Sequence, residues 1–198
     1  MRRAIVGVLY CTVLVGTMGV PRSAWAVASA SPTRSAPLKS VMLRLSDLRP
    51  GYTIQQRIYL SISDRTDSLG VGANQLRAEG WRASFDAYFR RGEPSVDSTA
   101  DQYGGANGAH WGFLTYMHGH NALGVYGRSP FAHFIAMPRV GNESMAYAPN
   151  PSNFGGWSGI LFREGPDVVN VSVSSTGHDA GSALALARLV DKRIQTGR

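Results

Sequence analysis

Residues 159–194 read GILFREGPDVVNVSVSSTGHDAGSALALARLVDKRI, and this stretch decides the fold. It begins with a short β-type run, ILFR, followed by a cluster of turn formers, EGPD. From Val169 onward apolar and polar residues alternate, so Val169, Val171 and Val173 share one face of a half-buried strand. The stretch therefore predicts a β-hairpin whose apolar face is covered by the helical segment that follows.

The closing segment, residues 180–194, has the spacing of an amphipathic helix. Its apolar stripe consists of Ala183, Leu186, Ala187, Val190 and Ile194. Asp179 precedes the segment where an N-cap is wanted, and Lys192 and Arg193 lie in the last turn, where they complement the helix dipole. We expect this helix to lie across the valine face of the hairpin.

Two longer segments alternate with a period of two and predict further strands. Residues 52–62 form the longest such run, and residues 81–90 form the second. The apolar face predicted for the second run consists of Trp81, Ala83, Phe85, Ala87 and Phe89. Residues 63–80, between the two runs, are rich in aspartate and glycine and are predicted to be a loop, with one helical turn at residues 75–79.

The middle of the chain is less regular. Apolar spacing predicts a helix over residues 106–117, although each glycine within it costs about 1 kcal/mol relative to alanine. Shorter strands are predicted at residues 95–103, 131–137 and 144–148. Together these elements predict an α+β fold, in which an antiparallel sheet has about two main helices packed on one face.

The amino terminus has the features of an export signal. Arg2 and Arg3 precede an uncharged apolar run over residues 4–20, and Ala24-Trp25-Ala26 fits a small-x-small cleavage site. This predicts a signal peptide at residues 1–26, a disordered Ala/Ser/Pro spacer at residues 27–40 and a single α+β domain at residues 41–198. The predicted location is secreted or extracytoplasmic, in the periplasm or cell envelope, with no integral membrane domain after cleavage. The alternative is that the apolar run stays in place as a membrane anchor.

Charge and cysteine content exclude several classes of function. The formal net charge is +7, but three of the arginines and the single cysteine fall within residues 1–26. The remaining basic residues are mostly isolated arginines without aromatic interleaving, so nucleic acid is not predicted as a partner. The mature chain lacks cysteine and therefore disulfides or thiolate metal sites.

The histidines are the most prominent candidates for chemistry. His118 and His120 are two residues apart, a spacing at which imidazoles on a strand can chelate a metal. No nearby carboxylate or cysteine completes a ligand set, and Ser158 lacks the strand-turn-helix context of a nucleophile elbow. We therefore predict no catalytic residues, no metal and no cofactor.

Aromatic residues surround the same histidines. The candidate ligand-binding residues are Trp111, Tyr116, His118, His120 and Tyr126. Aromatic and glycine-rich segments beside a sheet commonly form a ligand cleft. The alternative interpretation is that these rings complete the hydrophobic core.

Short motifs in the chain are similar to those of uncharacterised bacterial secreted and envelope proteins. Leu48-Arg49-Pro50-Gly51-Tyr52 is similar to the DLPxGF opening of many such proteins, and Phe162-Arg163 ahead of a valine strand is similar as well. Over residues 41–194 the arrangement loosely resembles PsbP-like lipoproteins and the extracellular sensor domains of some actinobacterial kinases. The resemblance implies no catalytic residues, and the paired cysteines of some sensor domains are missing here.

The leading functional prediction is an exported, non-enzymatic envelope domain that binds a small ligand, an envelope polymer or a protein partner. One alternative is a hydrolase or metal-dependent enzyme that uses the His118/His120 region. A second alternative is a purely structural envelope protein.

Overall fold

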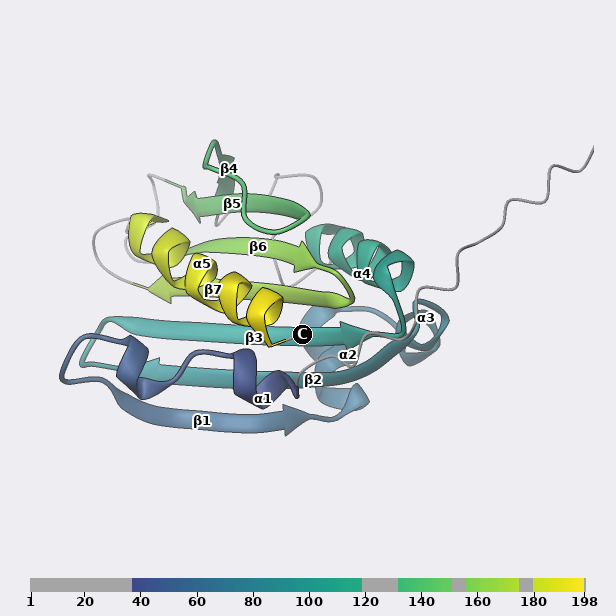
Figure 1. Cartoon of the computed structure of the whole chain (residues 1–198), viewed down its shortest axis with the longest axis horizontal. Helices are drawn as coiled ribbons and strands as arrows, with labels where there is room; N and C mark the ends of the chain where they lie inside the picture. Colours follow the sequence, from purple (N-terminus) through teal and green to yellow (C-terminus); the bar gives the residue numbers. More distant parts are fainter. Residues whose placement is uncertain (1–36, 119–131, 151–155, 175–179, 198) are drawn as a thin grey trace, which may run out of the picture. The chain divides into compact units, whose positions relative to one another are not determined.

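A computed structural model describes residues 37–118, 132–150, 156–174 and 180–197. These residues contain a seven-stranded sheet of strand order β1-β2-β3-β7-β6-β5-β4, in which all neighbouring strands are antiparallel (Figure 1). The strands are β1 (Thr53–Leu60), β2 (Trp81–Arg90), β3 (Ser95–Tyr103), β4 (Ala132–Ile135), β5 (Glu143–Pro149), β6 (Trp157–Glu164) and β7 (Asp167–Ser174). The predicted α+β class and antiparallel sheet are confirmed.

Two meanders meet in the middle of the sheet. One consists of β1, β2 and β3 and the other of β4, β5, β6 and β7, and they join where β3 pairs with β7. Ala100 lies opposite Val169 and Asp97 lies opposite Ser172 at this junction. Because side chains alternate along each strand, these two pairs face opposite sides of the sheet.

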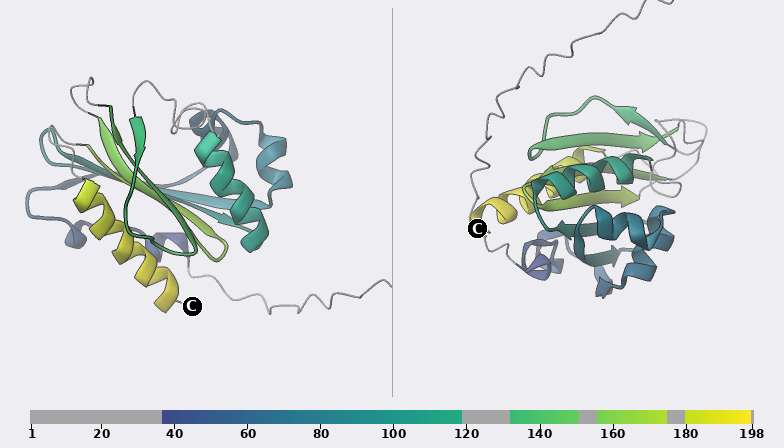
Figure 2. Two further views of the ribbon diagram at one scale, coloured as in Figure 1. Left: turned by 90° about the horizontal axis from the view of Figure 1, so that it is seen from above. Right: turned by 90° about the vertical axis from the view of Figure 1, so that its right-hand side faces the viewer.

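The helices cover both faces of the sheet. The described helices are α1 (Leu38–Val41), the 3-10 helix η1 (Leu45–Asp47), α2 (Ile62–Leu69), α3 (Ala73–Ala78), α4 (Ala106–His118) and α5 (Ala180–Thr196). Figure 2 shows α5 and α1 on one face and α2, α3 and α4 on the other, toward one end of the strands. The prediction of about two helices on a single face is therefore wrong. Both faces of the central strands carry buried apolar residues, so each face needs its own cover.

The larger core lies between the sheet and α5. Val169, Val171 and Val173 are buried there, as the alternation predicts, together with Phe85 and Phe89 of β2. The stripe of α5 that packs on them consists of Ala183, Ala187, Val190 and Ile194. The predicted valine face and its covering helix are confirmed, whereas Asp179 lies outside the described residues.

A smaller core lies under α4. It joins Phe113 of α4 to Leu69 of α2, Leu76 of α3, and Leu161 and Val168 of the sheet. The predicted helix over residues 106–117 is confirmed by α4. This core occupies only one end of the face, which leaves the other end to a different set of side chains.

The prediction of a loop at the start of residues 63–80 is wrong, because α2 lies there, whereas the helical turn predicted at residues 75–79 overlaps α3. Ser61 begins α2 with a capping box, in which its Oγ accepts from the Asp64 backbone N–H and Asp64 accepts from the Ser61 backbone N–H. Gly70 ends the helix in the left-handed conformation at φ 69°. The polar composition of α2 hides it from a search for apolar periodicity.

The predicted strand over residues 81–90 is confirmed, but its apolar face is wrong at the first residue. The register shifts between Trp81 and Ala83, which marks a bulge at Arg82. The bulge turns Trp81 to the α4 face, while Phe85 and Phe89 stay on the α5 face. This reversal places the indole of Trp81 beside Asp101.

The first helix, α1, begins at Leu38, whose side chain is buried against the α5 core. Among the described helices, none is both long and apolar enough to cross a membrane.

Candidate functional site

The sheet face on which α4 packs is apolar at the end beneath α4 and polar at the other end. We define the polar strip as Asp86 of β2, Asp97 and Thr99 of β3, and Asn170 and Ser172 of β7. The register places these residues side by side, with Thr99 opposite both Asp86 and Asn170. The described helices on this face lie over the other end of the strands (Figure 2). Polar groups in the middle of a central sheet cost stability unless they have partners, so the strip calls for a functional explanation.

Two carboxyl groups, those of Asp86 and Asp97, meet at the centre of the strip. Asp86 accepts hydrogen bonds from Gln56 Nε2 at 3.0 Å and from Thr99 Oγ1 at 2.8 Å. Oδ1 of Asp97 is buried and receives no hydrogen bond from any described residue. Burial and the neighbouring Asp86 carboxylate raise the pKa of Asp97 to about 8. Because this pKa lies above 7, Asp97 keeps its proton at neutral pH beside Asp86.

A buried ion pair closes the end of the strip nearest α4. Nε of Arg65 donates to both carboxylate oxygens of Asp101 at 2.9 Å, and Trp81 Nε1 donates to Asp101 Oδ1 at 2.9 Å. The guanidinium carbon of Arg65 lies 4.6 Å from the ring centroid of Tyr116. Burial lowers the pKa of Arg65, but the Asp101 carboxylate outweighs it and raises that pKa above its usual value. The Asp101 carboxylate is thus compensated by the charge of Arg65 and hydrogen-bonded by Arg65 and Trp81.

The acid pair differs from this ion pair because it has no basic partner. The ion pairs among the described residues join Arg65 to Asp101, Arg163 and His110 to Glu143, and Arg193 to Asp47. None of them includes Asp86 or Asp97. The strip therefore presents a carboxyl pair that forms no ion pair with a described residue, and Arg65, which is engaged with Asp101, lowers the pKa of Asp97 by less than burial and Asp86 raise it.

An aromatic pair borders the other end of the strip. The rings of Tyr88 and Trp157 lie 6.4 Å apart at an interplanar angle of 52°. They come from β2 and β6, and the small Ser95 and Ser174 on the two strands between them leave room for this contact. Trp157 is 38% exposed, and Tyr88 lies directly opposite Asp97. Partly exposed rings therefore stand next to the acid pair.

The side of the strip toward β5 is formed by Tyr147. Its hydroxyl donates to Asn170 Oδ1 at 3.0 Å, and its ring crosses Gly159 of β6 on the way. A Cβ at Gly159 would lie 2.4 Å from Tyr147 Cζ, so only glycine leaves space for the ring. Burial raises the pKa of Tyr147, which keeps the hydroxyl protonated and able to donate.

The structure separates the residues predicted from sequence to bind a ligand. Tyr116 is buried at 6% exposure and stacks on Arg65, whereas Trp111 is 59% exposed on α4. His118 lies in the exposed last turn of α4, and His120 and Tyr126 lie outside the described residues. Whether these residues bind a ligand stays a prediction.

The other histidine of α4 belongs to a surface network. Nδ1 of His110 lies 2.8 Å from Glu143 Oε2, and Arg163 Nε donates to Glu143 Oε1 at 2.6 Å. Burial raises the pKa of Glu143, but these two partners outweigh it and lower that pKa. Within the described part of the chain, no group of three histidine, cysteine or acidic side chains is placed to hold a metal ion.

Sequence reasoning missed the acid pair. Asp86 and Asp97 occupy the polar positions of two alternating strands, which ordinarily face solvent. The signal that was available is the length of the polar series in β3, where Asp97, Thr99 and Asp101 share one face. Only the pairing of β3 with β7 shows that this series lies in the centre of the sheet.

The fold is similar to that of a known extracellular domain and of a second mycobacterial protein. It matches the extracellular domain of PknH from Mycobacterium tuberculosis with a TM-score of 0.55 and 8% identity, over 82% of this chain and 98% of that one. It matches the Rv0999 ortholog from Mycobacterium smegmatis with a TM-score of 0.50 and the same identity and coverage. At this identity the likeness shows the fold alone. The expected resemblance to extracellular domains is confirmed at that level, and the resemblance to PsbP-like lipoproteins is not confirmed.

Neither a family model nor a curated protein matches the sequence.

Proposed function

We propose that the chain is an extracytoplasmic ligand-binding domain whose polar strip receives a ligand that carries a protonated amine. The observation that carries the proposal is the acid pair of Asp86 and Asp97, which lies in the sheet without a basic partner among the described residues. Strongly perturbed carboxyl groups of this kind concentrate at functional sites. The export signal predicted at residues 1–26 and the likeness in fold to an extracellular domain support the location.

The chemistry of the strip favours an ammonium group over a neutral or acidic one. An ammonium donates up to three hydrogen bonds and has no acceptor, which suits Oδ1 of Asp97. Its charge compensates the pair when the shared proton leaves. The faces of Tyr88 and Trp157 add cation–π attraction next to the carboxyls.

Binding of an amine is coupled to release of the shared proton. The ammonium competes with the proton that Asp97 holds, because both satisfy the same negative charge. The affinity for a permanently charged amine should therefore rise with pH up to about 8, the pKa of Asp97, and then level off. A ligand without a positive charge should show no such dependence.

The test is a titration of the full chain with butylammonium, followed by tryptophan fluorescence. We expect a signal that Trp157→Phe removes, because Trp157 borders the acid pair. Asp97→Asn should weaken binding at least tenfold, whereas Glu93→Gln on the exposed β2–β3 turn, which also replaces an acid by its amide, should not. Equal binding of 1-butanol, or equal effects of the two variants, would overturn the proposal.

A further inference from the structure

A second site lies on the opposite face of the same strands. A hollow of about 380 Å³ lies between α5, the residues that follow η1, and the β2–β3 turn. Its floor is formed by Val96 of β3 and Val173 of β7, which are the sequence neighbours of Asp97 and Ser172. Because side chains alternate along a strand, this end of the sheet is polar on the face of the polar strip and apolar on the opposite face, where the hollow lies.

The rim of the hollow is cationic. Arg49 and Arg91 line it and are exposed, and no hydrogen bond or ion pair links Arg49 to another residue in the described ranges. Asp47 also lines the hollow, but Arg193 holds it with two hydrogen bonds of 2.6 and 2.7 Å. The charge of Asp47 is therefore compensated, and the two rim arginines give the hollow a net positive charge.

The position of Arg91 is set by its contacts with the segment Leu48–Tyr52. Its guanidinium carbon lies 5.3 Å from the ring centroid of Tyr52, and its Nη1 lies 3.4 Å from the Pro50 carbonyl oxygen. Gly51, with φ 98°, brings the backbone so close that a Cβ there would lie 3.0 Å from Arg91 Cδ. The segment Leu48–Tyr52, which carries the motif noted in the sequence, thus shapes this rim.

We propose that this arginine-rimmed hollow binds an anionic amphiphile, a carboxylic acid with a short apolar tail. The two guanidinium groups would hold the carboxylate, for which their paired N–H groups are geometrically suited. The tail would lie on Val96 and Val173, between Leu48 and Leu186. At about 30 Å³ per non-hydrogen atom, the volume accommodates about a dozen such atoms, the size of a medium-chain fatty acid. This site is independent of the proposed amine site.

The test measures binding of octanoate to the full chain by isothermal titration calorimetry, with 1-octanol and inorganic phosphate as matched probes. We expect octanoate to bind and the other two to bind at least tenfold more weakly, because each lacks one half of the recognised chemistry. Binding should weaken with added salt, as the rim is exposed.

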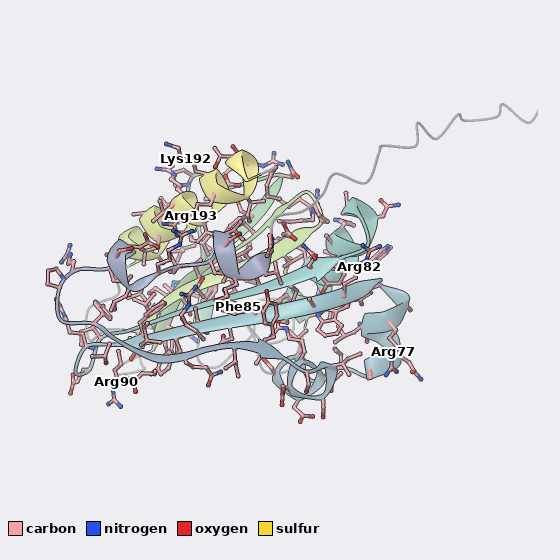
Figure 3. The ribbon with its side chains drawn as sticks, turned by 60° about the horizontal axis from the view of Figure 1, so that its bottom comes forward. Arg77, Arg82, Phe85, Arg90, Lys192 and Arg193 are labelled. Carbon is pink, nitrogen blue, oxygen red and sulfur yellow. The ribbon has the colours of Figure 1, made fainter. Side chains whose placement is uncertain are left out.

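Variants separate the hollow from general surface charge. The double variant Arg49→Gln, Arg91→Gln should weaken octanoate binding at least tenfold. The control Arg77→Gln, Arg82→Gln makes the same change in charge at the opposite end of β2 from Arg90 and should have no effect (Figure 3). Ala185→Phe, which fills the hollow and keeps the arginines, should abolish binding. Asp97→Asn should leave it unchanged.

The two arginine double variants change exposed side chains and Ala185→Phe fills an open hollow, so circular dichroism and the melting temperature should confirm that they fold. The same measurements check the fold of Asp97→Asn. Octanoate binding that survives both the arginine double variant and Ala185→Phe overturns the proposal. Equal affinity for 1-octanol would refute recognition of the carboxylate by the two arginines. Equal affinity for inorganic phosphate would refute recognition of the apolar tail. Failure of octanoate to bind at millimolar concentration overturns it as well.

Discussion

The acid pair should leave a measurable mark on folding, which Asp97→Asn removes. In the folded chain the pKa of Asp97 is raised from 3.8 to about 8, first by burial and second by Asp86. Between these values the folded state holds a proton that the unfolded state has lost. Stability must therefore fall as the pH rises through this window, and it levels off above the folded pKa.

The slope follows directly from the difference of one proton. At about 1.4 kcal/mol per pH unit, the wild type should lose about 3 kcal/mol of unfolding free energy between pH 5 and pH 7 on account of this group. Charged and titratable groups that act on the pair include Asp86, Arg65, Tyr116 and Tyr147. The tyrosines stay protonated in this range because burial raises their pKa values, and Arg65 stays charged. The window therefore belongs to the acid pair.

Asparagine at position 97 imitates the protonated acid, since its amide can donate to Asp86 and carries no charge. The assay is urea denaturation followed by circular dichroism at pH 5, 6 and 7. We expect the stability advantage of Asp97→Asn over the wild type to grow by about 3 kcal/mol between pH 5 and pH 7, because the wild type loses that amount over this range and the variant does not. Glu93→Gln controls for the replacement of an acid by its amide at an exposed position. A wild type and an Asp97→Asn variant with parallel pH profiles would refute the reasoning.

Three further substitutions test the surroundings of the strip. Asp101→Ala should cost about 3–5 kcal/mol of unfolding free energy, because Arg65 is left as an unpaired buried charge; urea denaturation showing a loss below 1 kcal/mol would contradict the buried ion pair. Gly159→Ala should cost about 1–3 kcal/mol and displace the ring of Tyr147, which the aromatic region of an NMR spectrum would report; unchanged spectra and stability would show that the ring is free to move aside. Trp111→Ala should change stability by less than about 0.5 kcal/mol, because the side chain of Trp111 is exposed. A ligand whose affinity falls in this variant without loss of melting temperature would support the predicted aromatic site. A large drop in melting temperature would instead place Trp111 in the core.

Alternation in the sequence was sufficient to predict the main strands. Val169, Val171 and Val173 lie on the core face because that strand is central and has no bulge. In β1 the register shifts between Ile54 and Gln56, so Ile54 and Ile58 point to opposite faces and both are exposed. A bulge adds one residue to one strand only, and composition carries no mark of it.

The candidate site could not be predicted from the sequence for the same reason. The bulge at Arg82 decides that Trp81 reaches Asp101, and the pairing of β3 with β7 decides that Asp97 is central. Both facts depend on contacts between segments far apart in the chain. Polar positions of alternating strands look like a solvated face until the partner strand is known.

The end of β3 and β7 that bears the polar strip is the part of the sheet least explained by folding. At the other end, Leu161 and Val168 complete a core under α4, which shows that this face can be apolar when a helix covers it. At the strip, the same face carries a carboxyl pair that destabilises the fold as the pH rises above about 4. Apolar residues of similar volume at Asp86 and Asp97 would remove that cost, as replacements of buried charges often do. A chain that needed this sheet only as a scaffold would gain stability from such replacements, so the presence of the acid pair supports the proposed amine site.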